Sequence, residues 1–166
     1  MKKLHVHNHI IRWRFIASYC AILIIPSIIA AQGKINIGVG ADLLEYYNIS
    51  FRYQGDQTQY ALGIGALRNE YKNRLSISAS FYYHFDGTSI LTSRRPWYGK
   101  ITVNYNKYDN DYLYSEPDNL SAGLRVGRDF NLSKKLAINS DIGFSIGRIG
   151  GVSFYPTTGI WLFYRI

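Results

Sequence analysis

The chain ends in the stretch Pro156-Thr-Thr-Gly-Ile-Trp-Leu-Phe-Tyr-Arg-Ile166. Alternate residues of a β-strand share one face, so Ile160, Leu162, Tyr164 and Ile166 predict a strand with an apolar face. At the end of a soluble domain such a strand would have an unpaired edge that promotes aggregation. In a membrane the same strand is stable when it closes a barrel by pairing with the first strand.

The same period of two recurs along the preceding sequence. It is clearest over residues 74–85. This run is longer than the roughly 5–6 residues of most strands in soluble proteins and matches the roughly 9–11 residues of a transmembrane strand. Further runs cover residues 35–42, 49–54, 60–66, 100–105, 120–127 and 136–147, where Ser140 alone interrupts the apolar face. With the terminal strand they predict about eight strands, the smallest even number in a bacterial transmembrane barrel.

Turn-forming residues separate these runs at 55–57, 68–70, 109–111 and 131–135. Transmembrane barrels have short turns on the periplasmic side and longer loops outside. With both termini periplasmic, turn 131–135 lies inside and the long segment 106–119 lies outside. Residues 86–96 form a longer periplasmic connection than expected, and the count of eight strands could fail there.

The first 33 residues have the features of a secretory signal peptide. A basic region precedes the apolar run 15–29, and Ala30-Ala31-Gln32-Gly33 supplies small residues for cleavage. We predict a signal peptide over residues 1–33, cleaved after Ala31 or Gly33, and a barrel domain over residues 34–166. An uncleaved membrane anchor and a lipoprotein attached at Cys20 stay alternatives.

Composition argues for a single domain and against nucleic acid as a partner. The chain is 47% hydrophobic and 18% charged, which fits one domain with a large buried or lipid-facing surface. Four of its 19 basic residues lie in residues 1–33, so the barrel domain has 15 basic and 11 acidic residues and a net charge of +4. These charges are scattered, whereas nucleic-acid binding requires a basic face or a recognisable module.

The two faces of the predicted strands have different partners in a membrane and in water. A soluble barrel turns its apolar face inward, whereas a transmembrane barrel turns it outward. The strand lengths, the signal peptide and the aromatic residues near the strand ends favour the transmembrane barrel. We then expect a polar network in the lumen, formed by Arg52, Arg74, Lys100, Arg125, Asp129 and Asp141. Side chains can fill an eight-stranded barrel, so we expect a packed lumen, with a small channel as an alternative.

No set of residues predicts catalysis, a cofactor or a metal site. Cys20 is the only cysteine and lies in the predicted signal peptide, and His84 is the only histidine of the barrel domain. Acid–base and nucleophilic catalysis usually use such residues. We interpret His84 as structural, near the periplasmic rim. Asp109, Asn110 and Asp111 resemble a calcium loop in composition, without its spacing.

On its strand pattern, on the hairpin at residues 130–136 and on its ending, the chain resembles the small outer-membrane β-barrel proteins of Gram-negative bacteria, including those of Bacteroidetes-type genomes. Members of this family have a C-terminal assembly signal of the form polar-x-Gly-x-x-apolar-x-aromatic. Thr157, Gly159, Leu162 and Tyr164 match it, although Arg165 and Ile166 follow, so the last residue is not aromatic. The resemblance implies an outer-membrane location, with membrane lipid and the barrel assembly machinery as partners.

The sequence leaves the biological role open between different classes of protein. The leading hypothesis is an outer-membrane barrel with a structural role or a role mediated by its external loops, and no catalysis. The alternatives are a soluble periplasmic or secreted β-barrel that binds a small apolar ligand, and a small outer-membrane channel. The partner of the external loops cannot be read from the residues.

Overall fold

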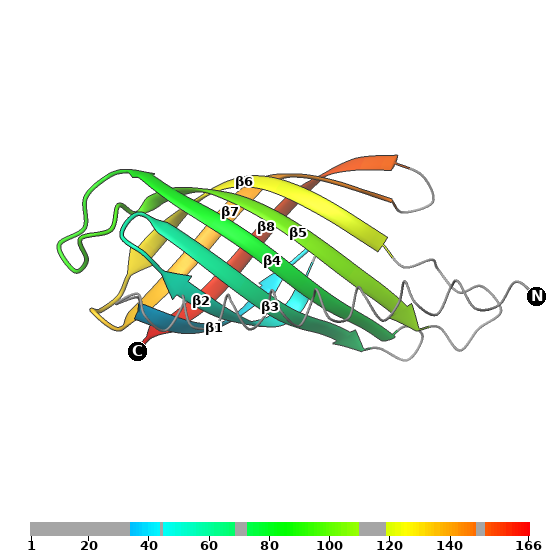
Figure 1. The fold of residues 1–166 in the computed structure, drawn as a ribbon, viewed down its shortest axis with the longest axis horizontal. Helices are drawn as coiled ribbons and strands as arrows, with labels where there is room; N and C mark the ends of the chain where they lie inside the picture. The colour runs from blue at the N-terminus through cyan, green and yellow to red at the C-terminus, as the bar shows by residue number, and fades with distance from the viewer. Residues whose placement is uncertain (1–33, 44, 69–72, 110–118, 149–151) are drawn as a thin grey trace, which may run out of the picture. The chain divides into compact units, whose positions relative to one another are not determined.

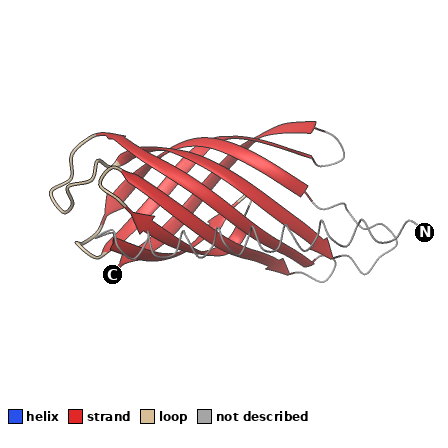
Figure 2. Ribbon diagram, viewed as in Figure 1, coloured by secondary structure: helices blue, strands red, loops and turns tan. Residues whose placement is uncertain are grey.

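The computed structural model describes residues 34–43, 45–68, 73–109, 119–148 and 152–166 (Figure 1). The predicted signal peptide and its cleavage site lie outside the described residues. Every regular element within these ranges is a β-strand (Figure 2). This part of the chain has no helix that is long and apolar enough to cross a membrane.

Eight strands form a closed, antiparallel, up-and-down barrel, which confirms the predicted fold class. The strands are β1 Lys34–Asp42, β2 Tyr46–Gln54, β3 Thr58–Arg68, β4 Asn73–Asp86, β5 Trp97–Asp109, β6 Asn119–Asn131, β7 Leu136–Arg148 and β8 Val152–Arg165. Each strand pairs with the next one in the sequence. Strand β8 pairs with β1, from Asn36 opposite Arg165 to Asp42 opposite Gly159, and closes the sheet.

Several strands extend beyond the alternating runs that predicted them. Strand β8 begins at Val152 instead of Pro156. The assignment of residues 106–109 to an external loop was wrong, because β5 continues to Asp109 with Asn106 opposite Ser76. Both faces of β5 are polar there, so hydrophobic alternation disappears while the backbone ladder continues. Residues 87–96 form a single connection between β4 and β5, and the count of eight strands holds.

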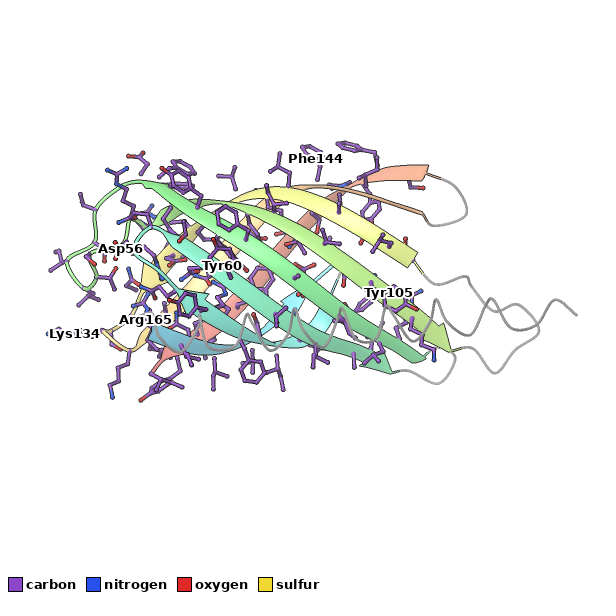
Figure 3. All side chains as sticks on the ribbon, in the orientation of Figure 1. Asp56, Tyr60, Tyr105, Lys134, Phe144 and Arg165 are labelled. Atoms are coloured by element: carbon purple, nitrogen blue, oxygen red, sulfur yellow. The ribbon has the colours of Figure 1, made fainter. Side chains whose placement is uncertain are left out.

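The barrel is apolar outside and polar inside. In β6 the outward Leu124 is 65% exposed, whereas the next residue, Arg125, is 1% exposed and points into the lumen. Tyr60, Tyr105 and Phe144 likewise lie on the outside of the barrel (Figure 3). This is the arrangement of a transmembrane barrel, and it is the reverse of the apolar interior that the soluble alternative requires.

The two ends of the barrel differ in their connections. We call the end where β1 begins and β8 finishes the termini end, and the other end the distal end. Three connections lie at the termini end, namely the turns 55–57 and 132–135 and the longer connection 87–96. Figure 3 shows Asp56, Lys134 and Arg165 at this end. The connection 87–96 turns at Gly87, which has a φ of 86° that favours glycine.

The returning half of connection 87–96 folds across the mouth of the barrel. The Pro96 carbonyl accepts a hydrogen bond from the backbone N–H of Asp129 at 2.8 Å. The backbone N–H of Arg95 donates to the side chain of Gln57 at 3.1 Å, and Arg94 is 4% exposed. The connection therefore contributes a charged side chain to the interior of the barrel.

The seam between β8 and β1 is paired over only part of its length. Strand β1 has 9 residues and β8 has 14, and the ladder between them ends where Asp42 lies opposite Gly159. One further hydrogen bond joins the backbone N–H of Leu43 to the carbonyl of Thr158 at 3.2 Å. Residues of β8 that precede Thr158 have no partner on this side among the described residues. The distal half of β8 is therefore a strand edge.

Candidate functional site

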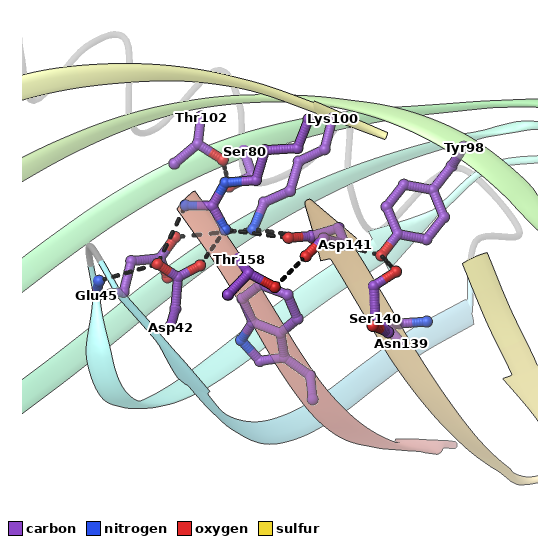
Figure 4. Close-up of polar contacts among 12 residues, drawn as sticks. Asp42, Glu45, Ser80, Tyr98, Lys100, Thr102, Asn139, Ser140, Asp141 and Thr158 are labelled. Carbon is purple, nitrogen blue, oxygen red and sulfur yellow. Dashed lines mark hydrogen bonds and ion pairs between the residues drawn. The ribbon is translucent and has the colours of Figure 1, made fainter. Parts of the chain in front are cut away.

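A cluster of charged side chains crosses the middle of the lumen. We call it the central cluster, and it consists of Asp42, Glu45, Lys100, Arg125 and Asp141. Asp42 ends β1, and Glu45 lies in the turn that follows. The other members point inward from β5, β6 and β7, so the cluster joins opposite walls of the barrel (Figure 4).

Arg125 holds the central cluster together. Its Nη2 donates to Oδ1 of Asp42 at 3.1 Å, and its Nη1 donates both to the other oxygen of Asp42 and to Oδ1 of Asp141, the latter at 3.1 Å. All three side chains are fully buried. A buried ion pair is tolerated only when the two charged groups satisfy each other's hydrogen bonds. The bidentate contact between Arg125 and Asp42 meets this condition.

Lys100 lies between the carboxylates of Glu45 and Asp141 in the central cluster. Its Nζ lies 3.8 Å from Oε1 of Glu45 and 3.8 Å from Oδ2 of Asp141, and 4.0 Å from the ring centre of Trp161. The other oxygen of Glu45 accepts a hydrogen bond from Ser78 at 2.9 Å. The amino group is thus surrounded by two carboxylates and an aromatic face, which together compensate its loss of water.

A second polar cluster lies nearer the termini end. We call it the termini cluster, and it consists of Arg52, Arg94, Asp129 and Asn139. Nη2 of Arg94 donates to Oδ2 of Asp129 at 2.7 Å, and Asn139 donates to the other oxygen of Asp129. The side-chain oxygen of Asn139 accepts from Nη1 of Arg52. Burial lowers the pKa of the Arg94 guanidinium, and the Asp129 carboxylate opposes this shift.

The six residues expected in a lumen network have different places. Lys100, Arg125 and Asp141 belong to the central cluster, whereas Arg52 and Asp129 belong to the termini cluster. Arg74 is a member of neither cluster as defined here, and its Nη1 donates to the hydroxyl of Tyr46. These contacts describe the packing of the residues, and the network's role is still a prediction.

Asp42 ends the predicted run 35–42 on its polar face, whereas two other charged members of the clusters were missed by the sequence reasoning. Glu45 follows β1 in a turn, and Arg94 lies in the connection 87–96, so neither belongs to an alternating run. Turn residues have no periodicity that reveals whether they point inward. The unexpected length of connection 86–96 was the only signal, because a chain segment longer than a turn can reach back into the barrel.

His84 points inward near the termini end. It is fully buried, and its Nδ1 lies 2.7 Å from the carbonyl oxygen of Arg95, so this nitrogen carries a proton and donates. The ring packs against Tyr98, with ring centres 5.3 Å apart. The contact ties connection 87–96 to β4. Among the described residues, no group of three or more His, Cys, Asp or Glu side chains could hold a metal ion.

The residues of the predicted assembly signal divide between the two faces of β8. Thr157 and Gly159 point into the lumen, whereas Leu162 and Tyr164 point outward and are 42% and 48% exposed. The final residues also take part in the ladder. The backbone N–H of Arg165 donates to the Lys135 carbonyl at 2.8 Å, and that of Ile166 donates to Ile35 at 3.0 Å.

Three solved structures with a similar fold are bacterial proteins. The N-terminal β-barrel domain of Pseudomonas aeruginosa OprF has a TM-score of 0.56 and 14% sequence identity, and the match covers 81% of this chain and all of that domain. Neisserial surface protein A has a TM-score of 0.45 and 15% identity, with 81% and 93% of the two chains covered. Ail, the attachment invasion locus protein of Yersinia pestis, has a TM-score of 0.43 and 13% identity, with 81% and 97% covered.

No protein-family model and no curated protein matches the chain. The Bacteroidetes-type origin has no support from the structural matches. At such low identity the similarity to the OprF domain shows the fold alone. The chain is thus an eight-stranded transmembrane barrel of the outer-membrane type with a lumen crossed by ion pairs.

Proposed function

We propose that the protein is located in the outer membrane of a Gram-negative bacterium and acts as a structural barrel or through its external loops, without catalysis. The central cluster is the observation that carries this proposal. Arg125 bonds to Asp42 and Lys100 lies between Glu45 and Asp141, so buried ion pairs join opposite walls of the lumen. Breaking such pairs to open a path for ions costs several kcal/mol, roughly 3–5 for a buried pair.

The termini cluster strengthens the case against a channel. Arg94 bonds to Asp129 inside the mouth at the termini end, which faces the periplasm in this proposal. An ion would therefore have to pass two layers of bonded side chains. Catalysis is disfavoured by the surroundings of His84, because its Nδ1 is bonded to the Arg95 carbonyl and the ring is fully buried.

Two measurements on the purified protein test the proposal. The first is electrophoretic mobility in SDS with and without boiling, and we expect the unboiled protein to migrate differently because a closed barrel resists SDS until heated. The second is ion conductance in a planar lipid bilayer, where we expect no discrete openings. Steady single-channel openings would support the small channel instead, and an unchanged mobility would contradict the membrane barrel.

A paired variant makes the conductance measurement more specific. The double variant K100A/R125A lacks both cations of the central cluster. Arg94 keeps its bond to Asp129 in this variant. We expect this variant to stay closed, and a third replacement, R94A, to produce openings. Openings in the wild type that persist unchanged in all variants would place the conducting path elsewhere and contradict a lumen closed by these side chains.

Membrane lipid and the barrel assembly machinery are the partners that we propose. Arg128 points outward near the termini end, with its Cζ 5.4 Å from the ring centres of both Trp97 and Phe130, a combination suited to the level of lipid headgroups. Leu162 and Tyr164 face outward, where a protein that binds the last strand can contact both side chains. We propose no role in nucleic-acid binding, and the Bacteroidetes-type origin stays a prediction.

The assembly signal can be tested in cells. We expect Y164A to reduce the amount of heat-modifiable barrel in the outer membrane, because it removes the aromatic residue of the signal. F154A removes an exposed aromatic residue from the same face of β8 outside the signal, and is the matched control. Equal losses in the two variants would contradict a specific role of Tyr164.

A further inference from the structure

The outward face of the barrel is mostly apolar, and Arg128 is a charged exception on it near the termini end. Arg128 lies three residues before Asn131, the last residue of β6. Its Cζ is 5.4 Å from the ring centres of both Trp97 and Phe130, and its guanidinium forms no hydrogen bond or ion pair with another residue that the structure describes. Trp97 begins β5 and Phe130 is next to last in β6, so the guanidinium reaches toward the termini end. A cation on a lipid-facing wall needs a partner from outside the chain.

The position of Arg128 is open to the membrane. Trp97 and Phe130 are 37% and 47% exposed, and Arg128 is exposed as well, so a lipid headgroup can reach the guanidinium from outside the barrel. In the strand ladder Trp97 lies between Arg128 and Asp86 of β4. No ion pair joins these two charges. The described residues therefore supply aromatic flanks for Arg128 but no anion.

Ser140 adds a second polar group to the same part of the outward face. It lies directly opposite Arg128 in the ladder between β6 and β7, and it is the residue that interrupts the apolar face in the sequence. Its side chain is exposed, and its hydroxyl makes no hydrogen bond with the described residues. Thr158 also faces outward, but its hydroxyl donates to the Asp141 carbonyl at 2.8 Å. An unpaired hydroxyl is costly in hydrocarbon, so Ser140 also needs a partner from outside the chain.

The two polar groups lie at different depths in the membrane. Arg128 reaches toward the termini end, whereas Ser140 lies four residues inside β7, which starts at Leu136. The hydroxyl is therefore the deeper group, just as the ester carbonyls of a phospholipid lie deeper than its phosphate. Val126 and Ile142 follow toward the distal end, opposite each other and 49% and 68% exposed. They give acyl chains an apolar path along the wall.

We propose that Arg128 and Ser140, with the flanking rings of Trp97 and Phe130, bind an anionic phospholipid of the inner leaflet. Its phosphate accepts from Arg128, and an ester carbonyl accepts from the hydroxyl of Ser140. The inference rests on the proposed outer-membrane location, in which the termini end faces the periplasm. A zwitterionic headgroup has its own ammonium group, which competes with the guanidinium for the phosphate. A net negative headgroup, such as that of phosphatidylglycerol, has no such competitor and is preferred.

The test is quenching of tryptophan fluorescence by phospholipids brominated on their acyl chains, in liposomes that contain the purified barrel. The barrel domain has two tryptophans, and Trp161 is only 2% exposed and faces the lumen, so lipid quenching reports on Trp97. We expect brominated phosphatidylglycerol to bind about fivefold more tightly than brominated phosphatidylcholine, as for one basic residue at an anionic headgroup. W97F should abolish the quenching.

Variants separate the roles of the two polar residues. R128Q should abolish the preference for phosphatidylglycerol. K134Q is the matched control, because it removes one positive charge from an exposed residue at the same end. Ether-linked phosphatidylglycerol lacks the ester carbonyls, so it should displace the brominated lipid less well than the ester-linked form does in the wild type. In S140A the two forms should displace it equally well.

The measurement distinguishes failure of the lipid site from failure of the proposed function. No quenching by either brominated lipid would contradict the membrane barrel itself. Quenching without a preference for phosphatidylglycerol in the wild type would overturn the lipid site and leave the membrane barrel intact. A preference that R128Q retains, or that K134Q also loses, would overturn it as well. Equal displacement by the ether and ester forms in the wild type would overturn the role of Ser140. Heat-dependent mobility in SDS checks that each variant folds.

Discussion

Arg125 and Asp42 are joined by two hydrogen bonds across the lumen although 83 positions separate them in the chain. Asp42 is the last residue of β1, and Arg125 lies in the middle of β6. Both side chains are fully buried, so neither can exchange this partner for water. The pair fixes the distal end of the short first strand to the opposite side of the barrel.

We predict that R125M lowers the free energy of unfolding by about 3–5 kcal/mol, because it leaves the carboxylates of Asp42 and Asp141 buried without their main cation. The measurement is urea unfolding of the detergent-folded protein, followed by tryptophan fluorescence. The double variant D42N/R125M should lose less than the sum of the single losses. The exposed Arg128 provides the control R128M, and a loss in R125M no larger than in R128M would contradict the role of the central cluster.

We predict different effects on stability from alanine at two strand glycines. A Cβ on Gly143 would meet the carbonyl oxygen of Leu124 and lie 2.6 Å from Cα of Arg125, both of which are backbone atoms that cannot move aside. G143A should therefore cost about 1–3 kcal/mol in urea unfolding. A Cβ on Gly99 has no atom within 4 Å, so G99A should be neutral or stabilising by up to about 0.5–1 kcal/mol. Equal effects of the two changes would contradict the close approach of β6 and β7 at Gly143.

We predict that P156V promotes self-association. The backbone of Thr158 faces β1, and residues two apart in a strand face the same side, so the backbone of Pro156 faces the open part of the seam. Proline has no N–H and protects such an edge, whereas valine supplies a donor that can pair with another chain. Sedimentation velocity in detergent measures the oligomer. F154V, which changes a side chain on the same edge without adding a donor, should stay monomeric.

We predict that D129N exposes connection 87–96 to trypsin. The change removes the negative partner of Arg94, whose bond to Asp129 is 2.7 Å long, and lets Arg94 leave the mouth of the barrel more often. Cleavage after Arg94, followed by mass spectrometry, should become about tenfold faster or more, as expected for a buried hydrogen bond between charged groups. D56N alters an exposed carboxylate at the same end and should not change the rate. Equal rates in the two variants would show that the ion pair does not hold the connection.

The sequence by itself determined the strands, their approximate number and their two faces. Leu75, Ile77 and Ala79 alternate with serines, and this local period of two needs no information from the rest of the chain. The inward direction of Lys100, Arg125 and Asp141 followed from the same pattern. Pattern reasoning failed at residues 106–109, because both faces of β5 are polar there and only pairing with β4 continues the strand.

Only the tertiary structure decided which inward charges meet. Alternation places Arg125 in the lumen, but its bond to Asp42 depends on closure of the barrel and on the register of eight strands. Glu45 and Arg94 lie in connections, where no periodicity reveals the direction of a side chain, and their positions depend on how each connection folds against the rest of the barrel. Local sequence thus specifies the face of each strand residue, whereas contacts across the lumen arise from closure, which brings distant segments together.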